Sequence, residues 1–239
     1  MSIKDIKDKI DSILPLSIAQ TEWDNVGVLI NTGSQCSNIL LAIDVTEEVI
    51  NECLEKNIKN IVSYHPVIFR PIKNIYENDI VSFLIRNQIN VFVPHTSWDP
   101  TINNYIYNLF NEGCLLENCG RNTRAIGDVI SILKKETGLN YLRVALNKYH
   151  NMNTTLPTMA VGAGSAFRYH DLKNSLIVSG EMDHHVILHF LRNYNTVILL
   201  EHSNSERIAL PYIKNLLKEA LKDYKIYISN KDKDPISII

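Results

Sequence analysis

Three histidines in this sequence each follow directly on a short apolar run. They are His65 after IVSY, His95 after VFVP and His202 after VILLE. Two of them have a carboxylate four residues later, which gives the pairs His95 with Asp99 and His202 with Glu206. Imidazole and carboxylate together suit Zn, Fe or Mn better than Mg or Ca, and one carboxylate can bridge two ions. A single histidine of this kind is more often a half-exposed hydrogen-bonded residue, but the repeated placement predicts a site for one or two divalent metal ions.

The runs before these histidines are expected to be strands of an α/β fold. Strand patterns at 26–30, 39–43, 60–63 and 91–93 alternate with helix patterns that begin at Ser2 and Thr46 and cover 79–87 and 103–111. In an open α/β sheet the carboxyl ends of the strands lie along one edge, where ligands bind, so the three imidazoles can meet there. If 202–206 forms a first helical turn, His202 and Glu206 project from one face.

A second lobe is expected from about residue 123, where the pattern changes towards β-rich segments. These lie at 125–132, 142–146, 159–161 and 176–179, with a polar loop at 147–155, and the chain closes with a strand at 196–200, a helix through 216–221 and a strand at 225–228. We therefore expect a first α/β lobe from 1–120 with 203–239, and a second α/β lobe from 121–202.

Composition excludes several classes of protein. The formal net charge of −2 provides no basic field for a phosphate backbone, so direct nucleic acid binding is not expected. No apolar run approaches the roughly 20 residues that cross a bilayer, so no membrane association is expected. The four cysteines form no C-x-x-C pair, and the N-terminal residues lack the apolar segment of a secretory signal. These features predict a cytoplasmic protein.

Other motifs have structural interpretations that compete with functional ones. Trp23 and Asp24 are either substrate contacts or, as we favour, a packing anchor and a capped loop. The glycine-rich segment 162–165 lacks the lysine of a phosphate-binding loop, so we expect a tight strand-to-helix turn. His185 and His189 lie four apart on a predicted helix and read as one polar face, because the glutamate of H-E-x-x-H is missing.

Six segments resemble, in chain order, the signature blocks of the NIF-three-like family, also called the GTP cyclohydrolase 1 type 2 family. They are WDNVGVLI (23–30), AIDVTEEVI (42–50), SYHPVIF (63–69), PHTSWD (94–99), GEMDHHVIL (180–188) and EHSNSER (201–207). The resemblance covers nearly the whole chain and is to the short eukaryotic form. It implies two similar α/β lobes with mixed sheets flanked by helices, a metal pair in the cleft between them, a homohexameric ring and transcription-factor partners.

The resemblance also implies a ligand set. His65 and Asp99 resemble ligands of the first metal, His202 resembles a ligand of the second, and Glu206 resembles the carboxylate that bridges both. Many members have two successive histidines before the proline, whereas this chain has Tyr64 and His65. Tyr64 is either a phenolate ligand, since a bound cation lowers the pKa of a coordinated group, or, as we favour, a supporting hydroxyl with a weaker or absent second ion.

Two further positions are candidates for moving protons. His95 is placed as a proton shuttle, or as a residue that orients Asp99 by hydrogen bonding. Glu181 is the second candidate, and with His184 and His185 it resembles residues that line the family's cleft.

Three functions remain open at this stage. The first is a metal-dependent hydrolase acting on a nucleotide-like substrate, for which the family name implies GTP and opening of its imidazole ring. The second is a non-catalytic, metal-stabilised oligomeric scaffold or regulatory protein that binds protein partners. The third is a module whose metal binds a phosphate without turnover. Sequence does not decide whether the chain is an enzyme, nor which metal it binds.

Overall fold

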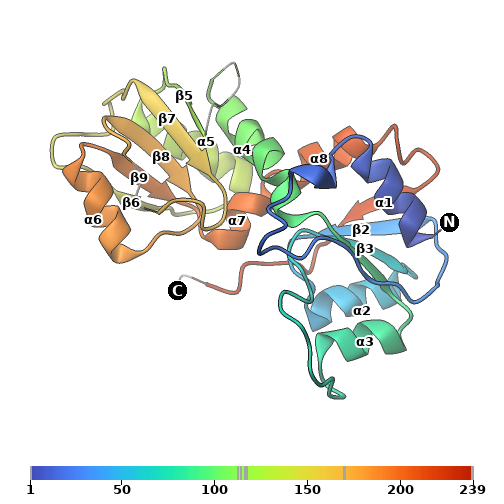
Figure 1. Ribbon diagram of the computed structural model, residues 1–239. Helices are drawn as coiled ribbons and strands as arrows, with labels where there is room; N and C mark the ends of the chain where they lie inside the picture. Colours follow the sequence, from blue (N-terminus) through green and yellow to red (C-terminus); the bar gives the residue numbers. More distant parts are fainter. Residues whose placement is uncertain (1, 112, 114, 116–117, 169–170, 238–239) are drawn as a thin grey trace. The chain divides into compact units, whose positions relative to one another are not determined.

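Two compact units make up the computed structural model, which describes residues 2–111, 113, 115, 118–168 and 171–237. The first unit is Met1–Trp98 with Leu210–Lys233, and the second is Asp99–Ala209 with Asp234–Ile239. Each unit contains a five-stranded mixed sheet flanked by helices (Figure 1). The predicted α/β fold class with mixed sheets is therefore confirmed.

The sheet of the first unit has the strand order β1-β4-β3-β2-β10. Four strands are parallel, namely β4 (Asn90–Val93), β3 (Asn60–Ser63), β2 (Asn38–Ala42) and β10 (Lys225–Ile228), and β1 (Gly27–Ile30) pairs antiparallel with β4. Every residue of β3 and β4 is buried, as expected for parallel strands covered on both faces. The carboxyl ends of β2, β3 and β4 consequently lie at one edge of the sheet.

Two helices cover each face of this sheet (Figure 1). One face carries α1 (Ile3–Asp11) and α8 (Leu210–Leu217), and the other carries α2 (Glu47–Glu55) and α3 (Ile80–Arg86). Ser2 caps α1 through a capping box with Asp5, as the sequence predicts for its start. The helix predicted at 216–221 lies too late in the sequence, because the buried positions of α8 are Leu210, Ile213 and Leu217, which have helical spacing.

The sheet of the second unit has the strand order β5-β7-β8-β9-β6. Its central strands β7 (Thr158–Gly162), β8 (Ser175–Ser179) and β9 (Thr196–Leu199) are parallel, and the edge strands β5 (Cys119–Arg121) and β6 (Arg143–Ala145) are antiparallel to their neighbours. The helices of this unit are α4 (Asp99–Asn108), α5 (Ile126–Thr137), α6 (His184–Arg192) and α7 (His202–Arg207). Apolar residues of α6 pack against β7, β8 and β9. Because these three strands are parallel, their carboxyl ends also form a common edge.

Two expectations for the second unit are wrong. The segment 125–132 was expected to be β-rich because of its isoleucines and valine, but it belongs to α5, whose buried residues Ile126, Val129 and Leu133 recur at helical spacing. The turn after β7 does not lead into a helix, since the next element among the described residues is β8. The short 3-10 helices η1 (Leu16–Ile18) and η2 (His95–Trp98) were not predicted.

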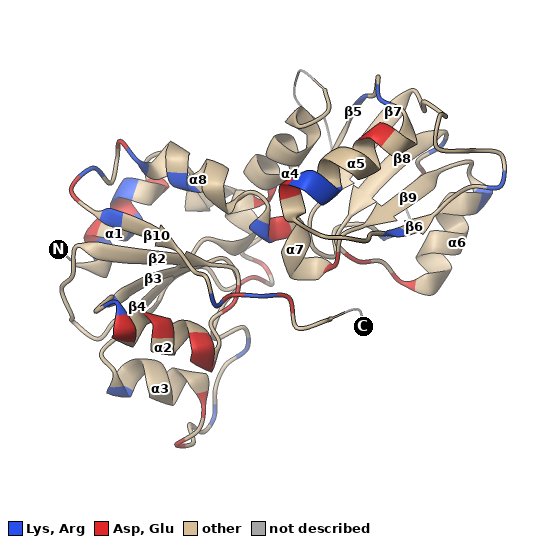
Figure 2. Ribbon diagram, turned by 180° about the vertical axis from the view of Figure 1, so that it is seen from behind, with Lys and Arg blue, Asp and Glu red and all other residues tan. Residues whose placement is uncertain are grey.

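Lys and Arg are interspersed with Asp and Glu along both units in the view of Figure 2. Within the described part of the chain, no helix is both long and apolar enough to span a bilayer. Cys36 and Cys53 are free thiols, and Cys114 lies outside the described residues.

A buried carboxylate on α2 connects this helix to the segment after β10. Glu52 is 2% exposed, forms an ion pair with Lys56, and accepts hydrogen bonds from the Ser229 hydroxyl at 2.5 Å and the Asn230 N–H at 3.2 Å. Burial alone would raise the pKa of Glu52, but the hydrogen bonds from Lys56, Ser229 and Asn230 lower it overall. The folded state therefore binds fewer protons at this site than the unfolded state, whose glutamate pKa is about 4.3.

We expect Glu52→Gln to reduce the free energy of unfolding at pH 7, and to reduce it by a smaller amount in acid. The contribution of the carboxylate is fully present above about pH 4.3 and is lost as pH falls through the lower folded pKa. Urea unfolding at pH 7 and pH 3.5 measures the difference in unfolding free energy between wild type and variant. This difference should be smaller at pH 3.5. Glu55→Gln, an exposed position on the same helix, is the control. An equal deficit at both pH values would contradict this assignment.

Candidate metal centre

In the first unit, His65 is held by a carboxylate from the neighbouring strand end. His65 follows β3, Asp44 follows β2, and the Nδ1 atom of His65 lies 2.9 Å from Oδ1 of Asp44. Asp232 supports this arrangement, because its carboxylate accepts the Ile43 N–H at 2.7 Å and the Asp44 N–H at 3.4 Å. A histidine whose Nδ1 is fixed in this way presents Nε2 as its ligand nitrogen, which is the usual arrangement in metal sites.

A second histidine of this unit is held by an aspartate whose side chain is buried. The Nδ1 atom of His95 lies 2.5 Å from Oδ1 of Asp24, and Oδ2 of Asp24 accepts the Thr96 hydroxyl at 2.6 Å. Burial tends to raise the pKa of Asp24, but hydrogen bonds from Thr96 and His95 lower it overall. The sequence predicts that Asp24 caps the loop, and it does accept the Asn25 N–H at 2.7 Å. It also orients the ring of His95, which the sequence does not predict.

Aromatic rings surround His95. The Tyr64 ring centroid lies 5.1 Å from that of His65 and 5.4 Å from that of His95, and the two histidine rings are 5.5 Å apart. Tyr64 is only 4% exposed, whereas Trp23, which contacts His95 edge-on at 6.1 Å, is half exposed. The first unit thus brings His65, Tyr64 and His95 together.

In the second unit, His202 and Glu206 lie in α7 as the sequence predicts. His202 Nε2 is 3.2 Å from Oε1 of Glu206, and His202 Nδ1 is 2.9 Å from Oε1 of Glu181, which follows β8. Glu206 is 2% exposed. Each of His65, His202 and Glu206 therefore offers a ligand atom of the kind that holds a metal ion.

The turn after β7 leaves space for the Glu206 carboxylate. Gly164 has a φ of +61°, and its N–H donates to the Ser205 hydroxyl at 2.8 Å. A Cβ atom at Gly164 would lie 2.5 Å from Glu206 Oε1 and 3.3 Å from His202 Nε2. The glycine thus suits both the backbone conformation and the close approach of the carboxylate.

The other predicted residues take different positions. Asp99 begins α4, directly after η2. His184 and His185 are exposed at the start of α6, with ring centroids 5.4 Å apart.

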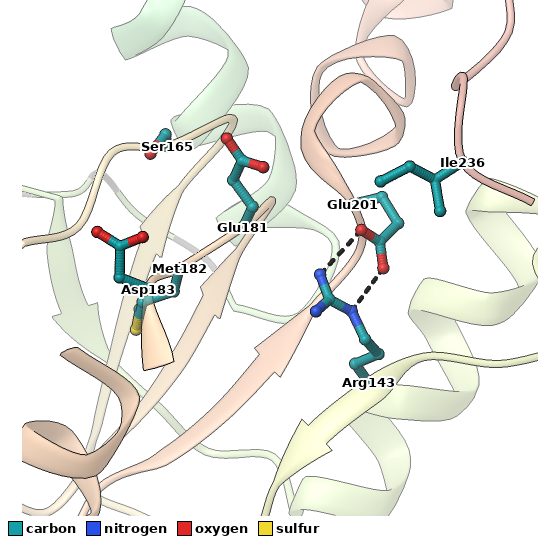
Figure 3. Close-up of a pocket in the computed structure, with 7 residues that line it drawn as sticks. All are labelled: Arg143, Ser165, Glu181, Met182, Asp183, Glu201 and Ile236. Atoms are coloured by element: carbon teal, nitrogen blue, oxygen red, sulfur yellow. Dashed lines mark hydrogen bonds and ion pairs between the residues drawn. The ribbon is translucent and has the colours of Figure 1, made fainter. Parts of the chain in front are cut away.

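A cavity of about 490 Å³ lies beside Glu181 in the second unit (Figure 3). It is lined by Arg143, Ser165, Glu181, Met182, Asp183, Glu201 and Ile236. Arg143 forms two parallel hydrogen bonds with Glu201, from Nε to Oε1 at 2.6 Å and from Nη2 to Oε2 at 2.8 Å. Glu201 has a φ of 68° and a ψ of 155°, a conformation essentially restricted to glycine that costs on the order of 1–3 kcal/mol for other residues.

A family model described as Duf34/NIF3 (NGG1p interacting factor 3) matches residues 1–235. The chain belongs to this family. Among its Duf34/NIF3 relatives, NIF3-like protein 1 of Drosophila melanogaster is 33% identical, over 95% of this chain and 86% of the relative. The GTP cyclohydrolase 1 type 2 homolog of Clostridium perfringens is 28% identical, over the full length of both chains.

Solved structures support the fold. The crystal structure of a hypothetical protein from Staphylococcus aureus superposes with a TM-score of 0.83 at 22% identity, over 100% of this chain and 99% of that chain. At this identity the similarity shows that the Duf34/NIF3 fold is shared.

Three site residues were not predicted from the sequence. Asp44 could have been found, because it follows a strand as directly as His65 does. Arg143 and Glu201 had no such signal, since 58 positions separate them and only the pairing of β6 with β9 brings them together.

Proposed function

We propose that this Duf34/NIF3 protein binds one or two divalent metal ions through His65, Asp99, His202 and Glu206. The observation that supports the proposal is the same in both units: each ligand histidine has its Nδ1 atom within 2.9 Å of a carboxylate, Asp44 for His65 and Glu181 for His202. Such carboxylates fix the ring and raise the basicity of the other nitrogen.

The donor set favours Zn, Fe or Mn, because these ions bind both imidazole nitrogen and carboxylate oxygen atoms. Tyr64 is buried beside His65, and the family resemblance implies a second histidine at its position in many members. We therefore propose that Tyr64 supports the site through its ring and hydroxyl, and that any second ion is bound more weakly than the first. Metal analysis of the purified protein would give the number of ions per chain.

We further propose that the protein is a hydrolase of nucleotide-like substrates, with ring opening of GTP as the first candidate. A metal ion held by these residues would supply Lewis-acid chemistry that polarises the substrate and activates water. His95, oriented by Asp24, would accept a proton from the reacting groups through Nε2 and return it later in the reaction. Glu181 was predicted to move protons, but its hydrogen bond to His202 favours an orienting role.

Chelation and reloading test the hydrolase. Protein stripped by a chelator should consume no GTP, and addition of Zn, Mn or Fe should restore product formation. His95→Gln keeps a polar side chain but removes the proton-accepting ring, so it should retain metal and lose at least about 100-fold in turnover, the scale typical of general acid–base catalysis. Turnover that persists in the stripped protein would contradict the proposal.

A non-catalytic role is the second candidate, and the family description favours it because it names an interacting factor. In this role the metal stabilises a homohexameric ring that presents a surface to protein partners. Glu206→Ala should then lower the melting temperature and shift the assembly to smaller species in analytical ultracentrifugation. Consumption of a nucleotide by the metal-loaded wild type, lost in the variant, would favour the hydrolase instead.

A further inference from the structure

Glu201, the residue before His202, has a backbone conformation that glycine adopts and other residues avoid. Its φ and ψ are 68° and 155°. Its carbonyl accepts the Ser205 N–H at 3.2 Å, so this strained residue also starts the hydrogen bonding of α7. A residue other than glycine keeps such a conformation only where its surroundings hold it.

Arg143 binds the side chain of Glu201. Its guanidinium binds both carboxylate oxygens of Glu201 in the planar bidentate geometry that makes arginine–carboxylate pairs strong and directional (Figure 3). The Glu201 side chain is 7% exposed, and Arg143 lies opposite Leu199 in the antiparallel pairing of β6 with β9. The edge strand is thus connected through this ion pair to the residue at which the chain leaves β9.

We infer that Arg143 and Glu201 are a positioning pair for the two ligands on α7. His202 follows Glu201 directly, and Glu206 lies one helical turn beyond, so a rotation about the Glu201 backbone would redirect both side chains together. The inference rests on the metal-binding role proposed above for His202 and Glu206. The role of the pair is to fix the backbone from which His202 and Glu206 project.

Three variants test this role. Glu201→Ala removes the ion pair and leaves a side chain that disfavours the backbone conformation, so Zn affinity should fall about 10- to 100-fold, as for other residues that orient ligands. Arg143→Lys keeps the charge but not the bidentate geometry, and should show a smaller loss of the same kind. Glu201→Gly also removes the ion pair, but glycine accepts the conformation, so it should recover most of the affinity that Glu201→Ala loses.

Hydrogen exchange of the Ser205 amide provides a second readout that needs no metal. Exchange should be faster than wild type in Glu201→Ala and close to wild type in Glu201→Gly, because this amide donates to the Glu201 carbonyl. Equal losses in the alanine and glycine variants would overturn the inference, and so would an alanine variant that behaves as wild type. If the wild type binds no Zn but the variants show the expected exchange pattern, the proposed metal function is refuted and the positioning of α7 by the pair is supported.

Discussion

Glu206→Gln should abolish most of the metal affinity while leaving the metal-free protein folded. The substitution keeps the shape of a residue that is 2% exposed but removes its charge, and a buried carboxylate is costly unless a cation compensates it. We expect a loss of more than about 100-fold in Zn affinity, beyond the 10- to 100-fold typical of residues that only orient ligands. Competition with a chromophoric chelator measures the affinity.

Thermal melting separates this effect from general destabilisation. A ligand that binds the folded state raises the melting temperature by an amount that grows with the logarithm of its concentration divided by Kd, so Zn should stabilise wild type and not Glu206→Gln. Glu219→Gln, which removes the same charge from an exposed position, is the matched control and should respond to Zn as wild type does. If Glu206→Gln were stabilised by Zn as much as wild type, Glu206 would not be a ligand.

Strand ends were the part of the fold and site that sequence predicted best. The runs before His65, His95 and His202 have the composition of buried strands, and the parallel order of β2, β3 and β4, and of β7, β8 and β9, makes their ends coincide. The pairing of His202 with Glu206 was predictable for a similar reason, because helical geometry relates residues four apart.

Partners distant in sequence could not be predicted in this way. Asp24 and His95 are 71 positions apart, and no periodicity relates them. Their contact depends on the path of the segment 19–26 between η1 and β1, which contains neither helix nor strand. The prediction for the segment 125–132 was wrong for a local reason. Its β-branched residues have high strand propensity, while its buried positions follow a helical period. Contacts and propensity conflicts of this kind are decided by tertiary packing.

Gly164→Ala should reduce metal affinity about tenfold or more while costing the fold little beyond backbone strain. The added Cβ would lie 2.5 Å from Glu206 Oε1, at the end of a side chain that can rotate away. The fold can therefore accommodate the methyl group, but the carboxylate loses its position relative to His202 Nε2. The expected affinity loss is of the size found for residues that orient ligands, and calorimetric titration with Zn measures it.

Gly138→Ala is the control that separates strain from displacement. Gly138 has a φ of +72° and no atom within 4 Å of an added Cβ, so this variant carries the backbone penalty alone, roughly 1–2 kcal/mol. Both variants should lose similar unfolding free energy in urea, and only Gly164→Ala should lose Zn affinity. Because displacement acts through Glu206, adding Gly164→Ala to Glu206→Gln should cause little further loss, a non-additivity expected for residues in contact. Full additivity would mean that Gly164 acts on metal binding by a route that does not involve Glu206.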